Sequence, residues 1–366
     1  MTAVRHIGIL TGGGDCPGLN AVIRAVVKCA VLDHRAQVTG FLDGFAGLVQ
    51  DRSRPLGFDD VSNILVQGGT ILGTSNRDDP FRVPVQTAEG LVYEDRSDQA
   101  VATLERHGVD ALIVVGGDGT LSIAQRLFEE KGVPIVGVPK TIDNDLSETD
   151  LTFGFDSARA VATEAVDRLH STAASHHRVM VVEVMGRHAG WIALEAGIAG
   201  GGDVILIPEI PFRYEAVVEG IERRAKRGRR FSLVVVAEGA RCPDGRTVVR
   251  KVVEGSPEPV RLGGIGAVVA DHLEGKLPFE VRHVVLGHLQ RGGTPTPFDR
   301  ILGTRFGVAA LKTALRRDWG CMAALRGDRI ECVAIRDAVA RLKLVDPEGE
   351  RVAVARSVGA VFGDES

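Results

Sequence analysis

The chain has 366 residues, a formal net charge of -4 and 44% apolar residues, which are proportions of an ordinary globular protein. This length exceeds the size at which one hydrophobic core keeps growing, so it favours two lobes. The small negative charge creates no field that would attract nucleic acid or an anionic membrane. No apolar run approaches the ~18 residues of a membrane span, and no signal peptide precedes the first strand-like segment. We therefore expect neither nucleic acid nor a membrane as a partner.

The cysteines are odd in number and form no CxxC pair. A scattered set of this kind indicates reduced thiols rather than a disulfide framework, and reduced thiols favour a cytoplasmic location. The five are Cys16, Cys29, Cys242, Cys321 and Cys332.

Short apolar runs alternate with helix-like segments, which predicts an α/β fold. Runs such as Leu112-Ile113-Val114-Val115 lack polar alternation, as is typical of parallel strands buried on both faces. Ligands of such sheets bind beyond the carboxyl ends of the strands, where glycine clusters follow three of the runs. The predicted strands are residues 6–11, 37–42, 111–115, 135–138, 179–184, 204–207, 233–237 and 283–287.

The first glycine cluster, Gly12-Gly13-Gly14, follows the first predicted strand and precedes a helix that begins near Asn20. Glycines allow backbone N–H groups to approach a phosphate, and the amino end of the helix adds positive potential. A tight turn without any ligand explains this cluster equally well.

The second cluster is Gly116-Gly117-Asp118-Gly119-Thr120, directly after an apolar strand. A carboxylate among glycines suits Mg²⁺ and a phosphate chain, which are partners in phosphoryl transfer. Similar segments also occur in lipid kinases and NAD kinases, so this cluster indicates nucleotide phosphates more strongly than any one substrate.

The third cluster, Lys140-Thr141-Ile142-Asp143-Asn144-Asp145, places two carboxylates beside a hydroxyl and an amide. Such a loop can supply a base and positioning groups, although an Asx-rich turn would also satisfy itself locally. Together with an acidic glycine loop expected at the same sheet edge, catalysis is the better interpretation.

Three further segments complete a recognisable order: Met185-Gly186-Arg187, Ala237-Glu238-Gly239 and Leu286-Gly287-His288-Leu289-Gln290-Arg291-Gly292-Gly293. With the clusters above, they resemble the phosphofructokinase family over roughly residues 5–340. The resemblance implies two Rossmann-like α/β lobes with the active site in the cleft between them. Residues 1–154 and 290–340 would form the nucleotide and Mg²⁺ lobe, and residues 155–289 and 341–366 the sugar-phosphate lobe.

The resemblance also implies roles for individual residues. Asp143 matches the catalytic base, Thr141 a residue beside the transferring phosphoryl group, and Arg187 one that neutralises its charge. The implied donor-binding residues are Gly13, Gly14, Arg77, Gly117, Asp118, Gly119 and Thr120, with Asp118 as the Mg²⁺ ligand. The implied fructose 6-phosphate ligands are Thr141, Asp143, Arg178, Met185, Gly186, Arg187, Glu238, Arg282, His288 and Arg291.

In the family, the equivalents of Arg178 and Arg282 reach in from a neighbouring subunit. The resemblance therefore implies a homotetramer or homodimer with shared active sites. Arg24 matches one residue of an effector site of bacterial relatives, whereas Lys28 stands where a second arginine is expected. Lysine keeps the charge but loses the planar fork, so the effector is left open.

Two positions bear on the phosphoryl donor. Gly119 resembles ATP-dependent members, because pyrophosphate-dependent members carry Asp there, while Lys140 resembles the pyrophosphate-dependent ones. An absent side chain opens space that nothing else can provide, so Gly119 decides in favour of ATP. The predicted function is thus ATP-dependent 6-phosphofructokinase in glycolysis. The alternatives are a pyrophosphate-dependent phosphofructokinase, a non-catalytic sugar-phosphate or nucleotide sensor, and a lipid or NAD kinase.

Overall fold

The computed structural model describes residues 4–88, 90–241, 245, 247–252 and 260–365. The chain divides into two compact units, each with its own hydrophobic core. Unit 1 comprises residues 1–142, 146–156 and 291–342, and unit 2 comprises residues 143–145, 157–290 and 343–366. Chain length alone favours such a division, because a single core stops growing well below 366 residues.

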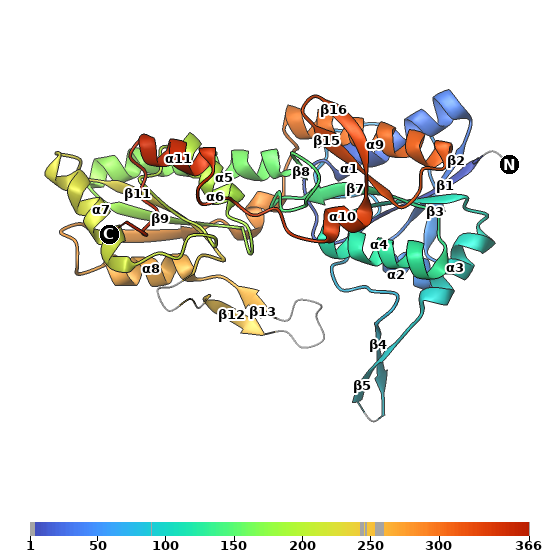
Figure 1. Cartoon of the computed structure of the whole chain (residues 1–366), viewed down its shortest axis with the longest axis horizontal. Helices are drawn as coiled ribbons and strands as arrows, with labels where there is room; N and C mark the ends of the chain where they lie inside the picture. The colour runs from blue at the N-terminus through green and yellow to red at the C-terminus, as the bar shows by residue number, and fades with distance from the viewer. Residues whose placement is uncertain (1–3, 89, 242–244, 246, 253–259, 366) are drawn as a thin grey trace. The chain divides into compact units, whose positions relative to one another are not determined.

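An eight-stranded sheet forms the centre of unit 1 (Figure 1). Its strand order is β16-β15-β7-β6-β1-β2-β3, with β8 beside β7. The inner strands are parallel, and the outer pairs β2-β3 and β15-β16 are antiparallel. Every residue of β6 is buried, which explains its unbroken apolar sequence. The strands are β1 (His6–Thr11), β2 (Gln37–Phe41), β3 (Ser53–Pro55), β6 (Ala111–Gly116), β7 (Ile135–Thr141), β8 (Phe153–Gly154), β15 (Cys321–Arg326) and β16 (Arg329–Ala334).

Helices cover both faces of this sheet (Figure 1). On one face α1 packs against α9, and on the other α3 packs against α4. The parallel order therefore places the loops that follow β1, β6 and β7 at one sheet edge. The helices are α1 (Leu19–Cys29), η1 (Ala30–His34), α2 (Phe45–Gln50), η2 (Asp59–Val61), α3 (Ser97–Arg106), α4 (Asp118–Lys131), α9 (Pro297–Arg316) and α10 (Ile335–Val339).

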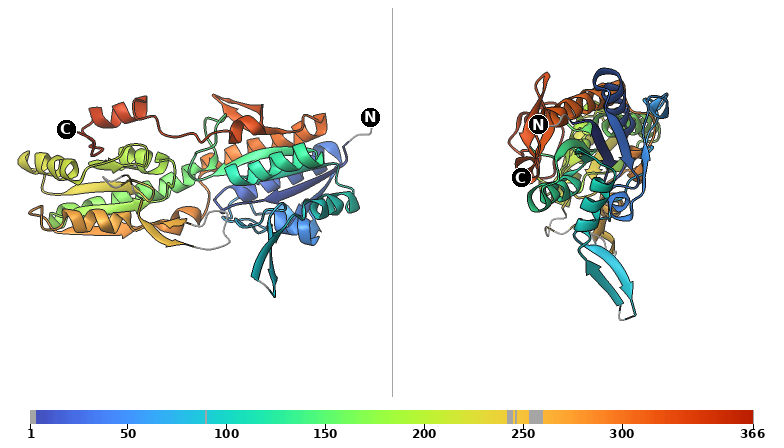
Figure 2. Two further views of the ribbon diagram at one scale, coloured as in Figure 1. Left: turned by 60° about the horizontal axis from the view of Figure 1, so that its bottom comes forward. Right: turned by 90° about the vertical axis from the view of Figure 1, so that its right-hand side faces the viewer.

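A two-stranded hairpin, β4 (Val83–Thr87) and β5 (Gly90–Glu94), stands out from the rest of unit 1 (Figures 1 and 2). The apolar residues Leu91, Val92 and Tyr93 are exposed on it. The sequence did not predict this hairpin, because its apolar residues follow no single buried face.

Cys321 and Cys332 form a disulfide that links β15 to β16. The expectation that all cysteines are reduced thiols is therefore wrong for this pair. The antiparallel hairpin brings together two residues that are 11 positions apart, a spacing that the absence of a CxxC pair does not test. Cys16 and Cys29 are free thiols, and Cys242 lies outside the described residues.

Unit 2 contains a four-stranded parallel sheet in the order β10-β11-β9-β14. All residues of β9 and β11 are buried, and α7 and α8 contribute apolar side chains to the same core. The elements are α5 (Phe155–His176), which begins at the end of unit 1, β9 (Val179–Val184), α6 (Trp191–Ala199), β10 (Val204–Leu206), α7 (Tyr214–Lys226), β11 (Ser232–Ala237), β12 (Val249–Val252), β13 (Val260–Leu262), α8 (Ile265–Leu273), β14 (Val281–Val285), η3 (Gly287–Arg291) and α11 (Glu350–Ser357).

The last segment of the chain, residues 343–366, belongs to unit 2. The backbone N–H of Val345 donates to Glu209 Oε1 at 2.8 Å, which holds the start of the segment. Near its end, Val361 pairs in parallel with Val204 on β10, the outermost strand. Phe362 is fully buried, and the Arg356 guanidinium lies 4.7 Å from its ring centroid. The segment thus completes the unit rather than trailing from it.

We predict that Phe362→Ala destabilises unit 2 by about 3 to 5 kcal/mol, because it removes a fully buried aromatic side chain and leaves a cavity. Val358→Ala is the matched control, since Val358 lies in the same segment and is 77% exposed. Amide hydrogen exchange of unit 2 measures the loss without requiring two-state unfolding of the whole chain. Equal exchange rates in the two variants would contradict the structural role of this segment.

All eight predicted strands are present, and the α/β fold class is confirmed. The run predicted at 283–287 is displaced, because β14 spans Val281–Val285 and a 3₁₀ turn begins at Gly287. Within the described residues, no helix combines the length and the apolar character needed to cross a bilayer.

Candidate active site

The first glycine loop lies between β1 and α1 in unit 1, and a neighbouring loop anchors it. The N–H of Gly13 donates to the Ser75 carbonyl at 2.8 Å, and the Thr74 hydroxyl donates to the Gly13 carbonyl at 2.7 Å. Gly13 has φ of 79°, a left-handed conformation that glycine adopts without strain. The predicted donor residue Arg77 belongs to the anchoring loop and is exposed. The structure therefore places the loop that carries Arg77 beside Gly13.

Two cationic side chains lie against this glycine loop. The Lys140 ammonium donates to the Gly14 carbonyl at 2.5 Å and lies 3.1 Å from where a Cβ of Gly13 would be. An Arg291 guanidinium nitrogen donates to the Asp15 carbonyl at 3.2 Å and lies 2.8 Å from the equivalent position on Gly14. Glycine backbone and cationic side chains are groups that bind phosphate oxygens in proteins, and we call this set of residues the cradle.

The second glycine loop joins β6 to α4 beside the first. Thr120 is buried, and its side chain fills the space next to Gly12 and Gly116, where any Cβ would approach it within 3 Å. A Cβ on Gly117 would lie 3.4 Å from the Lys140 carbonyl and 4.0 Å from Thr141 Cβ. The loops after β1, β6 and β7 thus meet at one edge of the unit 1 sheet, as the sequence predicted.

Asp118 is the first residue of α4 and is exposed at the amino end of the helix. A hard, solvent-facing carboxylate beside glycine backbone fits Mg²⁺, which binds few protein ligands and takes the rest from water and phosphate oxygens. Among the described residues, no group of three potential metal ligands includes Asp118. This composition suits an ion that arrives with a nucleotide better than a permanently caged ion.

Gly119 is exposed at the second position of α4. A Cβ added there would meet no atom of the described chain within 4 Å, leaving aside the backbone of its own helix and its two neighbours in the chain. The space above this residue is therefore open, in contrast to the close packing around Gly12 and Gly116.

Cys16, which follows the first glycine loop, is fully buried against Gly154 and donates weakly to the Phe153 carbonyl. Burial raises the pKa of the Cys16 thiol to about 12, so it carries no thiolate at neutral pH. Its position beside the cradle therefore reflects packing, and covalent catalysis by this cysteine is excluded.

The acidic segment begins where β7 ends. Thr141 is the last residue of β7, and its carbonyl accepts from the Thr152 hydroxyl at 2.7 Å. Asp143 is half-buried, two residues further on. Lys343 holds the following residues, because its backbone N–H donates to the Asp145 carbonyl at 2.7 Å and its ammonium to the Asn144 amide oxygen at 2.9 Å. Asn144 has φ of 52°, a left-handed backbone conformation that asparagine adopts more readily than most residues, so the residue type suits this turn.

In unit 2, predicted sugar-phosphate ligands follow the neighbouring strands β9 and β11. The N–H of Gly239 donates to the Gly186 carbonyl at 3.1 Å, and a Cβ on Gly239 would lie 2.0 Å from the Arg187 carbonyl. This contact brings Met185, Gly186 and Arg187 beside Glu238. Arg187 also donates to the Val260 carbonyl at 2.9 Å.

Gln290 belongs to the motif that follows β14, although no role was predicted for it from the sequence. It is fully buried, accepts from the Met185 N–H at 3.3 Å and donates to the Gly287 carbonyl at 3.1 Å. It therefore joins the loop after β9 to the turn that carries His288, which is itself exposed. Only the long-range contact reveals this positioning role.

Arg178 and Arg282 lie at the amino ends of the unit 2 strands, opposite the loops that follow β9 and β11. Arg178 directly precedes β9, and Arg282 is the second residue of β14. Both form ion pairs with Glu280, whose pKa is lowered by the hydrogen bond from Arg178 and by the charges of both arginines. A strand rises about 3.3 Å per residue. Roughly 20 Å or more along β9 therefore separates Arg178 from Gly186, and a similar distance along β14 separates Arg282 from His288. One copy of unit 2 therefore does not bring these arginines to His288.

Each unit is built on a mainly parallel sheet with helices, and unit 1 carries glycine loops and two cationic side chains beyond its strand ends, so the protein belongs to the α/β class in which ligands bind at such loops. Residues 6–314 match the family model described as Phosphofructokinase. The chain belongs to the phosphofructokinase family.

Named relatives are similar along almost their whole length. The chain is 52% identical over 366 residues to "ATP-dependent 6-phosphofructokinase 2" of Clostridium perfringens, covering 100% of each chain. It is 53% identical to "ATP-dependent 6-phosphofructokinase" of Chloroflexus aurantiacus, covering 99% of this chain and 98% of the other. It is also 53% identical to "Pyrophosphate--fructose 6-phosphate 1-phosphotransferase" of Amycolatopsis methanolica, covering 94% and 97%.

Solved structures share the fold. Phosphofructokinase of Pichia pastoris in the T-state aligns with a TM-score of 0.79 and 32% identity over 98% of this chain, which spans 37% of the yeast chain. A pyrophosphate-dependent phosphofructokinase of Nitrosospira multiformis aligns with a TM-score of 0.80 and 20% identity, covering 95% of this chain and 88% of the other.

Proposed function

We propose that the protein is an ATP-dependent 6-phosphofructokinase that transfers the γ-phosphoryl group of ATP to the C1 hydroxyl of fructose 6-phosphate. The products are fructose 1,6-bisphosphate and ADP, and the reaction belongs to glycolysis in the cytoplasm. The observation that carries the proposal is the loop of Gly13 and Gly14, with the Lys140 ammonium against it, beside the Asp118 loop. The names of the full-length relatives point to the same reaction.

In this proposal, unit 1 binds the phosphoryl donor and unit 2 binds the sugar phosphate. Asp143 accepts the proton of the C1 hydroxyl as the hydroxyl oxygen attacks the phosphorus atom. A carboxylate with an ordinary pKa of ~4 is already ionised at pH 7, so its position matters more than its basicity. Arg187 stabilises the charge of the transferring group. Mg²⁺ held by Asp118 would supply further charge neutralisation when bound.

The relatives do not select the donor, since ATP-dependent and pyrophosphate-dependent names occur at 52% and 53% identity. The open space above Gly119 favours ATP, because it leaves room for the α-phosphate. The Lys140 ammonium beside Gly13 and Gly14 favours pyrophosphate only weakly, since a cation there can accompany a phosphate of either donor.

The proposal is tested with purified protein, fructose 6-phosphate, Mg²⁺ and either ATP or pyrophosphate. Fructose 1,6-bisphosphate is measured with each donor at matched concentration. A product formed with ATP at a much higher kcat/KM supports the proposal. A preference for pyrophosphate would retain the sugar-phosphate reaction but overturn the donor, and no product with either donor would overturn the enzyme itself.

We further propose that Arg178 and Arg282 bind the 6-phosphate of a sugar held by a neighbouring subunit in a homotetramer or homodimer. Both arginines lie at the amino ends of their strands, while Gly186 and His288 follow the carboxyl ends. Glu280 holds the two guanidinium groups together, which prepares them for one anion.

We predict that Arg178→Ala and Arg282→Ala each raise the KM for fructose 6-phosphate at least tenfold. Mixtures of either variant with Asp143→Asn, denatured and reassembled, should recover activity above both parents. A mixed oligomer contains some sites with intact arginines from one subunit and an intact base from the other. Native mass spectrometry must show that hybrids form. Hybrids without any gain in activity would contradict the shared site.

A further inference from the structure

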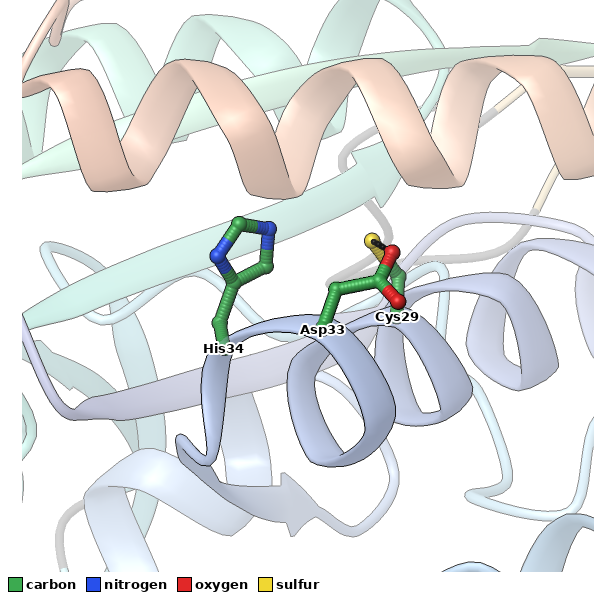
Figure 3. A group of neighbouring side chains, drawn as sticks. All are labelled: Cys29, Asp33 and His34. Carbon is green, nitrogen blue, oxygen red and sulfur yellow. Dashed lines mark hydrogen bonds between the residues drawn. The ribbon is translucent and has the colours of Figure 1, made fainter.

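Three side chains of different chemistry gather where α1 ends and η1 begins. They are Cys29, the last residue of α1, and Asp33 and His34, the last two residues of η1. One ligand atom from each lies within 4.8 Å of the other two. Figure 3 shows the three side chains rising from the same side of the helical turn. No role in the proposed phosphoryl transfer uses any of them.

The π-helical turn is what brings the three together. In an α-helix, residue i+5 points about 140° away from residue i, so Cys29 and His34 would diverge. Here the N–H of Arg35 donates to the Ala30 carbonyl five residues earlier, and the wider turn returns His34 to the side of Cys29. Such π-helical turns are rare and occur frequently at functional sites.

The distances suit a tetrahedral transition metal ion. Bonds of roughly 2.3 Å to sulfur and 2.0 Å to oxygen place those two ligand atoms about 3.5 Å apart on one ion. Cys29 Sγ and Asp33 Oδ2 are 3.6 Å apart, already close to this value. Cys29 is buried, whereas Asp33 and His34 are exposed, so an ion can enter from the side of these two residues.

The ligand set distinguishes between metals. Sulfur, imidazole nitrogen and carboxylate oxygen together favour Zn²⁺, whereas Mg²⁺ prefers oxygen ligands only.

We propose that Cys29, Asp33 and His34 form a binding site for one Zn²⁺ ion, separate from Asp118. Binding replaces the thiol proton of Cys29, which passes to solvent, and water completes the coordination. The 11 residues of α1 extend about 16 Å, so the ion lies far from the glycine loop at the other end of the helix. Its effect would be to fix the end of α1 rather than to take part in phosphoryl transfer.

The test uses the full-length protein after removal of metal, without Mg²⁺, nucleotide or sugar phosphate. We expect one equivalent of Zn²⁺ per chain by native mass spectrometry and calorimetry. Cys29→Ser and His34→Ala should each weaken zinc binding at least tenfold and keep basal activity. Co²⁺ gives a readout on the unmodified chain, because a thiolate ligand produces a charge-transfer absorption band that non-thiolate sites lack.

Two control variants isolate the site. His107→Ala removes an imidazole that lies 2.6 Å from a carboxylate oxygen of Asp51. These two residues form a histidine and carboxylate pair without a thiol. Cys242→Ser removes a thiol elsewhere in the sequence. Both should bind Zn²⁺ like the wild type. Absence of uptake by the wild type, a cobalt complex without the thiolate band, or unchanged binding in either Cys29→Ser or His34→Ala overturns the proposal.

Discussion

Asp143→Asn is expected to lower kcat by ~10²- to 10⁴-fold, which is the usual contribution of general-base assistance. The substitution keeps the shape of the side chain but removes the site that accepts the proton. Fructose 6-phosphate affinity should stay within a few-fold, because Asn144 and Asp145 still hold the turn through Lys343. Steady-state kinetics with ATP, together with equilibrium binding of the sugar phosphate, measure both effects.

Asp150→Asn is the control for that experiment. Asp150 is exposed in the same connection between β7 and β8, where its carboxylate accepts from the Gly327 N–H at 2.6 Å. Its substitution should leave kcat nearly unchanged. An Asp143→Asn enzyme that keeps most of its turnover would remove Asp143 from the role of base.

Gly119→Asp is expected to abolish most ATP-dependent activity. Two unit charges ~4 Å apart repel by about 4 kcal/mol at an effective dielectric near 20, which corresponds to nearly a thousandfold change. Residue 119 is exposed, so water and salt reduce this repulsion, and we expect a loss of roughly 30- to 1000-fold in kcat/KM for ATP. The loss of pyrophosphate use should be smaller, because pyrophosphate carries no adenosine-bearing α-phosphate.

Gly119→Ala separates charge from size in this test. A Cβ at residue 119 would meet no atom of the described chain within 4 Å, setting aside the backbone of its own helix and its two chain neighbours, and alanine favours helix, so this variant should fold and keep most of its ATP activity. An aspartate near the amino end of α4 is also compatible with the helix dipole. Full ATP activity in Gly119→Asp, or equal loss in both variants, would contradict the assignment of residue 119 as donor selector.

The sequence predicted those features of the fold that depend on local residue patterns. Buried strands such as β6 are recognisable in the sequence as unbroken apolar runs. Parallel pairing of these strands then places their glycine loops at the same end of the sheet. The roles of Asp143 and Asp118 came from the family resemblance, and they stay proposals until the kinetics are measured.

The remaining features depend on contacts between distant parts of the chain. The position of Arg291 beside Asp15 joins residues 276 apart, and Gln290 reaches Met185 across 105. The Cys321–Cys332 pair follows from the antiparallel register of β15 and β16, which apolar runs do not encode. The hairpin of β4 and β5 was missed because neither strand has one consistently buried face.

The last segment of the chain, residues 343–366, also covers β10, the outermost strand of the unit 2 sheet. The N–H of Ile205 donates to the Val361 carbonyl at 2.9 Å, and the Val361 N–H donates to the Asp203 carbonyl at 3.0 Å. An edge strand without such cover is a template for pairing with other chains, and β10 consists only of apolar residues, Val204-Ile205-Leu206. A chain shortened before Val361 should therefore lose both the cover of β10 and the buried side chain of Phe362, and its uncovered strand should favour intermolecular pairing and loss of solubility.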